Sequence, residues 1–167
     1  MATIELPHTP NCLVCGRGNP HGLHLSLHVE PQTGVVTTRW TPSGDQIGFQ
    51  GIVHGGAVAT VLDEAMVWAA TWAGRRFCVC GEMTVRFRES AAVGEEVVVT
   101  ARVDVARARL VTTSGDVKRV DGTGIATASG KYVPLPDERH RAFVGTLVEE
   151  AGTARAAGVL RGGANPG

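Results

Sequence analysis

Gly51-Ile-Val-His-Gly-Gly-Ala-Val-Ala-Thr-Val-Leu-Asp-Glu-Ala-Met66 is the most informative segment of this sequence. It opens a segment, from about Gly55 to Ala73, that is rich in helix formers and has no Gly or Pro after its first two residues. The segment is apolar nearly all round, and its polar residues are Thr60, Asp63, Glu64 and Thr71. Other elements enclose a helix of this kind, whereas a surface helix has a polar face. The sequence therefore predicts one buried helix, ended by Gly74 at its C-terminal cap.

Alternating apolar residues predict β-strands on both sides of this helix. The expected strands are residues 23–29 and 35–40 before it, and 78–88, 96–104, 109–118 and 124–133 after it. One enclosed helix with about six strands has a natural solution. This is an α+β fold in which an antiparallel sheet of about five to six strands wraps around one long central helix. Such a sheet leaves edges and faces for a partner, so we expect an oligomer.

The chain has 167 residues, which suits one domain. We expect this domain at residues 23–136. Residues 1–22 are punctuated by Pro and Gly too densely for a helix or strand, and predict an irregular arm. Residues 137–167 are expected to be a largely disordered extension, because Glu149–Gly167 is rich in Ala and Gly and has no periodicity.

Composition excludes several classes of function. The 16 basic and 16 acidic residues give a formal net charge of zero, which argues against nucleic-acid binding and against binding to an anionic membrane surface. The longest apolar runs are too short to span a bilayer. The first residues lack the basic and apolar regions of a secretory signal. We therefore expect a cytoplasmic protein whose four cysteines are reduced.

The start of the helix and its middle both carry features that need an explanation. Gly55 and Gly56 are poor helix residues, but they let a ligand approach the unpaired N–H groups at the positive end of the helix dipole. This arrangement suits a developing oxyanion. Asp63 and Glu64 lie deep in an apolar helix, where an unpaired carboxylate is costly. Each of them needs a structural partner or a function.

Helix geometry limits how these features can act together. Gly56 and Asp63 are seven residues apart, so they lie on one stripe but about 10 Å apart along the axis. One helix cannot hold a carbonyl at its N-terminus and attack it with its own Asp63. If both features act together, the site must combine two chains, which predicts a two-fold dimer with Gly56 of one chain facing Asp63 of the other.

The run His54-Gly-Gly, followed after six residues by Asp63, resembles the hotdog-fold acyl-CoA thioesterases, in particular the branch of PaaI and 4-hydroxybenzoyl-CoA thioesterase. The resemblance covers about residues 11–133. It includes Cys12-Leu-Val-Cys-Gly-Arg-Gly-Asn-Pro-His-Gly-Leu23, which is similar to the N-terminal arm of many PaaI-like members. His-Gly-Gly with an acidic residue nine positions after the His is more specific than His-Gly-Gly alone.

The resemblance implies hydrolysis of an acyl-CoA thioester to the free acid and coenzyme A. It implies that Asp63 is the nucleophile or general base, that the Gly56 N–H polarises the carbonyl, and that His54 shapes the start of the helix. It also implies a homodimer or homotetramer that needs no metal and no cofactor, with coenzyme A entering only as part of the substrate.

Further residues are candidates for substrate binding. Gly55 belongs to the helix start, and Arg86 and Arg88 share one face of a strand that could meet the coenzyme A phosphates, although such a pair is equally often a solvated face. Many relatives carry an Asn where this chain has Gly48, and Gln46 or Gln50 is a candidate substitute. Cys80 stands near a position where some relatives have Ser or Thr. The aromatic residues Phe49, Trp68, Trp72 and Phe87 are candidates for an acyl pocket, with Trp68 and Trp72 expected in the core.

Other interpretations compete with these. Asp63 would be purely structural if backbone N–H groups satisfied it, and Glu64 is expected to be structural, paired with an Arg. Cys12 and Cys15 could join Cys78 and Cys80 in a zinc site, but small apolar packing is favoured over it. On the same fold, the alternatives to a thioesterase are a non-catalytic acyl-CoA-binding or regulatory protein and, ranked below it, a hydratase or dehydratase.

Overall fold

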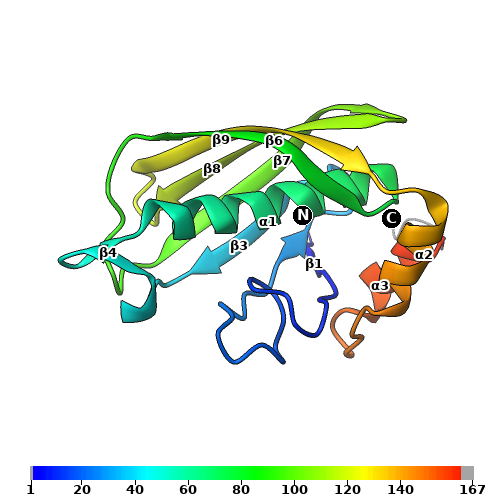
Figure 1. Ribbon diagram of the computed structural model, residues 1–167, viewed down its shortest axis with the longest axis horizontal. Helices are drawn as coiled ribbons and strands as arrows, with labels where there is room; N and C mark the ends of the chain where they lie inside the picture. Colours follow the sequence, from blue (N-terminus) through cyan, green and yellow to red (C-terminus); the bar gives the residue numbers. More distant parts are fainter. Residues whose placement is uncertain (1, 163–167) are drawn as a thin grey trace.

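The computed structural model describes residues 2–162, which form one antiparallel sheet wrapped around a long helix (Figure 1). The helix is α1 (Gly55–Gly74). After it come four long strands, β6 (Cys78–Phe87), β7 (Val97–Arg107), β8 (Leu110–Arg119) and β9 (Gly124–Pro134). The shorter strands before it are β1 (Ile4–Glu5), β2 (His28–Val29), β3 (Val36–Trp40), β4 (Ile47–Phe49) and β5 (Ile52–Val53). The predicted α+β hotdog arrangement is confirmed.

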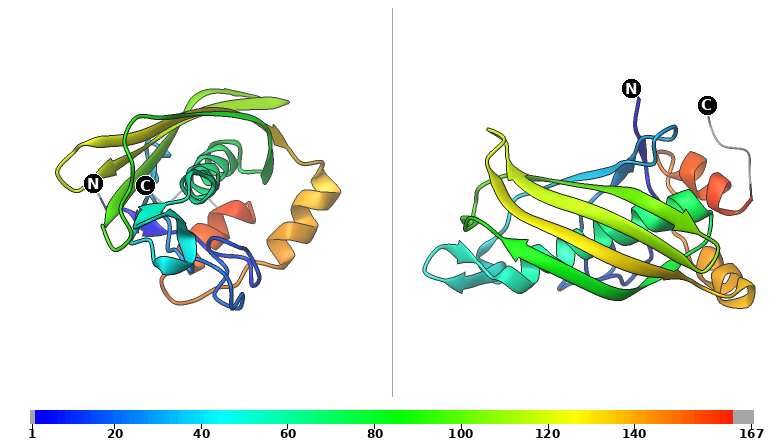
Figure 2. Two further views of the ribbon diagram at one scale, coloured as in Figure 1. Left: turned by 60° about the vertical axis from the view of Figure 1, so that its left-hand side comes forward. Right: turned by 90° about the horizontal axis from the view of Figure 1, so that it is seen from above.

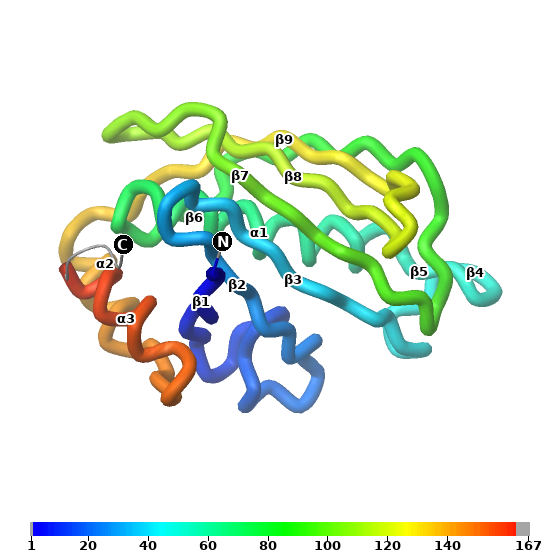
Figure 3. Tube along the Cα trace, turned by 180° about the vertical axis from the view of Figure 1, so that it is seen from behind, coloured from blue at the N-terminus to red at the C-terminus, as the bar shows by residue number. Residues whose placement is uncertain are grey.

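Seven strands of the described chain form the main sheet, in the order β1-β2-β3-β7-β8-β9-β6, which is slightly more than the five to six expected (Figure 3). All neighbours pair antiparallel. β6 is an edge strand, because its only partner in the described chain is β9. The remaining two strands, β4 and β5, form a separate hairpin beyond the N-terminal end of α1.

The sheet arches over α1, and the N-terminal arm and C-terminal segment lie on the opposite side (Figure 2, left). Because these elements enclose α1, the helix is apolar nearly all round. Its buried residues are Val58, Val61, Leu62, Ala65, Met66, Trp68, Ala69, Ala70, Thr71 and Trp72. The two tryptophans therefore belong to the core, as expected. Among the described residues, no helix is long and apolar enough to cross a membrane.

The predicted strand at residues 23–29 is wrong for most of its length. Only His28 and Val29 pair with β3. His24 has a φ of +53°, which interrupts an extended strand. The N–H groups of Leu23 and Leu25 donate to carbonyls of the arm, at Leu13 and Val14, over 2.8 Å each. The alternating pattern therefore reflects alternate burial of the leucines against the hydrophobic core, without a β-strand.

The predicted disorder of the C-terminal extension is also wrong for its described part. Residues 137–162 contain α2 (Asp137–Gly145) and α3 (Ala154–Leu160). Asp137 forms an ion pair with Arg76, just after α1. α3 buries Ala156, Ala157, Val159 and Leu160. Alanine gives little contrast in a hydrophobicity pattern, so the sequence shows no clear periodicity there. Residues 163–167 lie outside the described part.

The end of α1 differs from the expected cap in one residue. Gly74 is the last helical residue, and Arg75 takes the left-handed position that glycine usually occupies, with a φ of +52°. The Arg75 guanidinium lies 4.2 Å from the centre of the Trp72 ring. This cation–π contact offsets part of the backbone strain.

Candidate active site

Asp63 lies in the third turn of α1 and is held from the sheet. The hydroxyl of Tyr132 on β9 donates a hydrogen bond of 2.8 Å to Asp63 Oδ1. Tyr132 is completely buried, whereas Asp63 is only half-buried. The carboxylate is therefore anchored on its inner side and reaches the edge of the core. The backbone N–H groups considered as an alternative partner are not needed to explain its position.

The register of β6 and β9 brings Cys80 to the same place. Cys80 is the direct partner of Tyr132 across these strands. The register shifts between Cys80 and Glu82, so Gly81 is an extra residue in β6. Such bulges commonly redirect side chains beside functional sites. Cys80, Tyr132 and Asp63 thus form one group at the edge of the sheet.

Electrostatics keeps two members of this group protonated. Burial, and then the negative charge of Asp63, raises the pKa of the Tyr132 hydroxyl well above its usual value of 10. The same two causes raise the pKa of the Cys80 thiol. Tyr132 is therefore a permanent hydrogen-bond donor to the carboxylate. Cys80 is a thiol rather than a thiolate beside it.

Close packing makes room for the Tyr132 ring. A methyl group at Gly130, two residues earlier on the same face of β9, would lie 2.7 Å from Tyr132 Cε2 and 3.0 Å from Met66 Cε. Only glycine fits this space without a shift of its neighbours. The tyrosine therefore depends on Gly130 to reach Asp63.

His54 forms the N-terminal cap of α1. Its Nδ1 atom accepts a hydrogen bond of 2.9 Å from the Gly56 N–H. His54 is therefore a turn residue with a local hydrogen bond. The N–H group that the family resemblance assigns to the substrate carbonyl is occupied by this imidazole.

The helix start also borders a pocket. Gly55 and Arg88 line it, together with Phe87 and Ser90. A methyl group at Gly55 would lie 3.3 Å from the Phe87 ring, so this glycine allows the ring to pack against the helix. The structure therefore brings Gly55 and Arg88 together at one end of the site.

The other predicted substrate-binding residues lie apart from this pocket. Arg86 is exposed on β6 and does not line the pocket. Gln50 is exposed at the turn between β4 and β5, next to Phe49, which is 81% exposed. Gly48 lies against His54, where a methyl group would be 3.1 Å from the His54 Cα atom. A larger residue at position 48 would therefore displace the cap.

Within one chain, the two ends of the site stay separate. Gly56 and Asp63 belong to one unbroken helix, so their separation along the axis is about 10 Å. No bend brings them together. Gly56 and Asp63 of one chain therefore do not meet.

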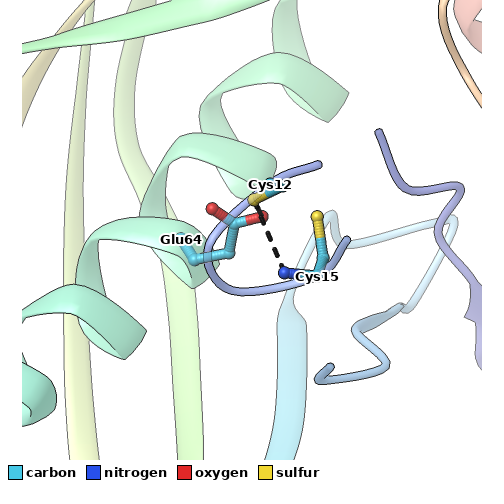
Figure 4. A group of neighbouring side chains, drawn as sticks. All are labelled: Cys12, Cys15 and Glu64. Carbon is cyan, nitrogen blue, oxygen red and sulfur yellow. Dashed lines mark hydrogen bonds between the residues drawn. The ribbon is translucent and has the colours of Figure 1, made fainter. Parts of the chain in front are cut away.

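A second polar cluster is built around Glu64, the residue that follows Asp63 in α1 (Figure 4). Glu64 Oε1 accepts hydrogen bonds from the Trp68 Nε1–H at 3.0 Å and from the Cys12 thiol at 3.6 Å. The expected pairing of Glu64 with an Arg is therefore wrong. The sulfur atoms of Cys12 and Cys15 lie within 4.8 Å of each other and of a carboxylate oxygen of Glu64. Cys78 and Cys80 are not part of this cluster.

Burial and hydrogen bonding shift the acidities in the cluster. Burial, and then the Cys12 charge, raises the pKa of Glu64 to about 7. The hydrogen bond with Cys15 is the largest of the effects that lower the pKa of Cys12 to about 5. The same interaction, together with burial, raises the pKa of Cys15 far above its usual value.

Comparison with known proteins supports the family expected from the motif. The model of the thioesterase superfamily matches residues 50–126. The resemblance to the hotdog-fold thioesterase superfamily is confirmed. This match contains the whole of α1, with His54, Gly56 and Asp63. No match was found among curated protein sequences.

Solved structures of thioesterase-superfamily proteins share the fold of this chain. The thioesterase superfamily protein RHA08564 is 25% identical with a TM-score of 0.69, over 74% of this chain and 60% of its own length. The chain thus spans less than two thirds of that protein. Escherichia coli PaaI, from the phenylacetic acid degradation operon, is 18% identical with a TM-score of 0.59, over 62% of this chain and 75% of PaaI. Streptococcus mutans smu.793, bound to acetyl CoA, is 15% identical with a TM-score of 0.62, over 66% and 88%.

Sequence reasoning missed Tyr132. A signal was present: Tyr132 is the only tyrosine in the chain, and it shares the core face of its strand with Ala126 and Ala128. A buried tyrosine hydroxyl needs a hydrogen-bond partner. The partner itself depends on the register across the sheet.

Proposed function

We propose that the protein hydrolyses an acyl-CoA thioester to the free acid and coenzyme A, with Asp63 as nucleophile or general base. The observation that carries this proposal is the placement of Asp63. Its carboxylate is costly in an apolar helix, it is anchored at Oδ1 by Tyr132, and it remains partly accessible. A carboxylate held in one orientation at the edge of the core suits attack on a carbonyl or on a water.

The two chemical routes differ in what Asp63 attacks. As a nucleophile, it adds to the thioester carbonyl carbon, expels the coenzyme A thiolate and leaves a mixed anhydride that water hydrolyses. As a general base, it removes a proton from a water that attacks the same carbon. In both routes Tyr132 is a positioning residue, because it holds the carboxylate and keeps its own proton.

Coenzyme A is the proposed carrier of the acyl group. The similar structure of smu.793 is described as bound to acetyl CoA, and that of a Streptococcus pneumoniae hypothetical thioesterase as a complex with coenzyme A. In this chain, Arg88 and the exposed Arg86 are the proposed contacts for phosphate groups. Gln50 and Cys80 are proposed to contact the substrate near the helix start and near Asp63, respectively.

The helix start completes the proposed site from a second subunit. Its Gly55-Gly56 N–H groups would polarise the thioester carbonyl. Since the Gly56 N–H donates to His54 Nδ1, the substrate carbonyl must displace this imidazole. The displaced cap and the carbonyl are both acceptors, so the exchange leaves the N–H satisfied.

The exposed edge of β6 is the proposed dimer interface. Its outer side is unpaired in the described chain, and Val79 and Phe87 at its two ends are exposed. Cys80 stands beside Asp63, and Phe87 packs on Gly55. An antiparallel β6 pair centred between Met83 and Thr84 would place Cys80 opposite the partner's Phe87. The partner's helix start would then approach Asp63.

Complementation between two inactive variants tests this composite site. Asp63→Asn removes the reacting group, and Gly56→Pro removes the N–H at a position where the first helical turn tolerates proline. Each homodimer should be inactive. Random mixing should restore about a quarter of the wild-type rate, because half of the dimers are mixed and each has one intact site. A mixture as inactive as its components would contradict the composite site.

One observation favours a second candidate, a non-catalytic acyl-CoA-binding protein. His54 occupies the N–H group that catalysis requires. A binding protein would take up acyl-CoA with saturation and release no coenzyme A. The thioesterase would release it, and the Asp63→Asn variant would bind without turnover.

A further inference from the structure

Outside the proposed active site, three metal-ligand side chains converge from two distant segments. Cys12 and Cys15 belong to the N-terminal arm, and Glu64 belongs to α1. Their sulfur and oxygen atoms lie within 4.8 Å of one another (Figure 4). Ligand atoms bound to one tetrahedral ion at about 2.0–2.3 Å also lie only a few ångströms from one another. The atoms therefore need only small movements to share one ion.

The turn between the two cysteines is preorganised. Cys12 Sγ accepts hydrogen bonds from the backbone N–H groups of Val14 at 3.3 Å and Cys15 at 3.5 Å. Such bonds favour the thiolate, which is the form that binds metal. The Gly16 N–H donates to the Cys12 carbonyl at 3.0 Å and closes the turn.

Glycine at position 16 is required by this turn. A methyl group there would lie 2.3 Å from the Cys12 backbone nitrogen and 2.6 Å from its carbonyl oxygen. The sequence Cys12-Leu-Val-Cys-Gly16 thus has the spacing of a two-cysteine metal loop, and its fifth residue has a physical reason to be glycine.

The third side chain is also fixed. Glu64 Oε1 accepts the 3.0 Å hydrogen bond from the Trp68 indole, whose ring is buried in the core. Metal-binding carboxylates are typically oriented by a hydrogen bond of this kind. Among the described residues, the side chains that hydrogen-bond to Glu64 are the Cys12 sulfur and the Trp68 indole, and neither is a cation. A divalent ion would balance the negative charge collected there.

We propose that Cys12, Cys15 and Glu64 bind a zinc ion that fastens the N-terminal arm to α1. Two sulfur ligands select a thiophilic ion over calcium or magnesium, and a carboxylate is an accepted zinc ligand. Three protein ligands leave the fourth position to solvent. A pocket is lined by Leu13, which lies between the two cysteines in the sequence, and by Thr60, one turn before Glu64.

Metal uptake by the reduced, full-length protein tests the proposal directly. The protein is stripped with a chelator, and zinc binding is followed by metal analysis and by competition with a chromophoric chelator. Cobalt is then used as a spectroscopic probe. We expect one ion per chain, and a sulfur-to-cobalt charge-transfer absorption typical of thiolate ligation.

Variants separate this site from unspecific binding. Cys12→Ser and Cys15→Ser should lose the charge-transfer absorption, and Glu64→Gln should weaken zinc binding by at least the factor of about 10 to 100 that loss of a group orienting a ligand costs. Cys78→Ser and Cys80→Ser are matched controls that should bind like the wild type. No uptake by the reduced wild type, or equal binding by the Cys12 and Cys78 variants, would overturn the proposal. Circular dichroism of each metal-free variant checks that it is folded.

Discussion

Tyr132→Phe is the variant that tests the role of the anchored carboxylate most sharply. It removes one oxygen from a completely buried ring and keeps the shape of that ring. The lost interaction is a 2.8 Å hydrogen bond to a carboxylate, and bonds to charged groups contribute about 1.5–3 kcal/mol. If the same interaction holds Asp63 in its reactive orientation, kcat should fall by about 10-fold or more, because 1.4 kcal/mol corresponds to a factor of ten. KM for acyl-CoA should change little, since the Tyr132 side chain is completely buried and out of reach of a ligand.

The matched control is Thr38→Val, which also deletes a buried hydroxyl. Thr38 lies on β3, away from Asp63, and its Oγ1 donates a 2.8 Å hydrogen bond to the Ser26 carbonyl. Both variants should lower the free energy of unfolding, measured by chemical denaturation. Only Tyr132→Phe should lower kcat, measured as free thiol released from acyl-CoA. Equal kcat values for the two variants would refute the positioning role of Tyr132.

Three further predictions concern the surroundings of the site. Gly130→Ala should destabilise the fold by about 1–3 kcal/mol in thermal denaturation, because its methyl group would clash with the Tyr132 ring, whereas Gly124→Ala, which has open space, should not. His54→Ala should lower the free energy of unfolding by about 1 kcal/mol through loss of the helix cap, while His54→Asn retains most of it, and equal losses would contradict the cap. Burial, and then the Arg76 charge, lowers the pKa of His140 below its usual value of 6.5, so the folded protein binds fewer protons than the unfolded chain and becomes less stable as the pH falls through 6.5. A His140→Asn variant should show a flatter dependence of urea stability on pH in this range, and an unchanged slope would speak against the effect.

The elements that the sequence predicts well are those with strong local patterns. α1 has a long apolar run with polar residues at few places, and β6 to β9 alternate clearly, so their existence and order are confirmed. The predictions of secondary structure fail where an alternating pattern has a cause other than a strand, or where a helix has no clear pattern. Residues 23–27 alternate because their leucines pack against the hydrophobic core while the backbone bonds to the arm. α3 is built largely from alanine and glycine, whose patterns carry little contrast.

The residues of the candidate site are also predictable only in part from the sequence. His54 and Asp63 are marked in the sequence by two glycines and by a carboxylate in an apolar helix. The Tyr132–Asp63 hydrogen bond joins residues 69 positions apart on β9 and α1. The contact between Cys12 and Glu64 spans 52 positions. Such pairings depend on register and on how the arm crosses the helix, which no local pattern specifies.

Release of free coenzyme A from a panel of aliphatic and aromatic acyl-CoA substrates distinguishes hydrolysis by Asp63 from binding alone. The wild type and the Asp63→Asn variant are compared, with binding of the same substrates measured by calorimetry. We expect turnover of at least one substrate by the wild type, and a loss of turnover with retained binding in the variant. Equal turnover by both proteins, or binding without turnover by the wild type across the panel, would contradict this expectation.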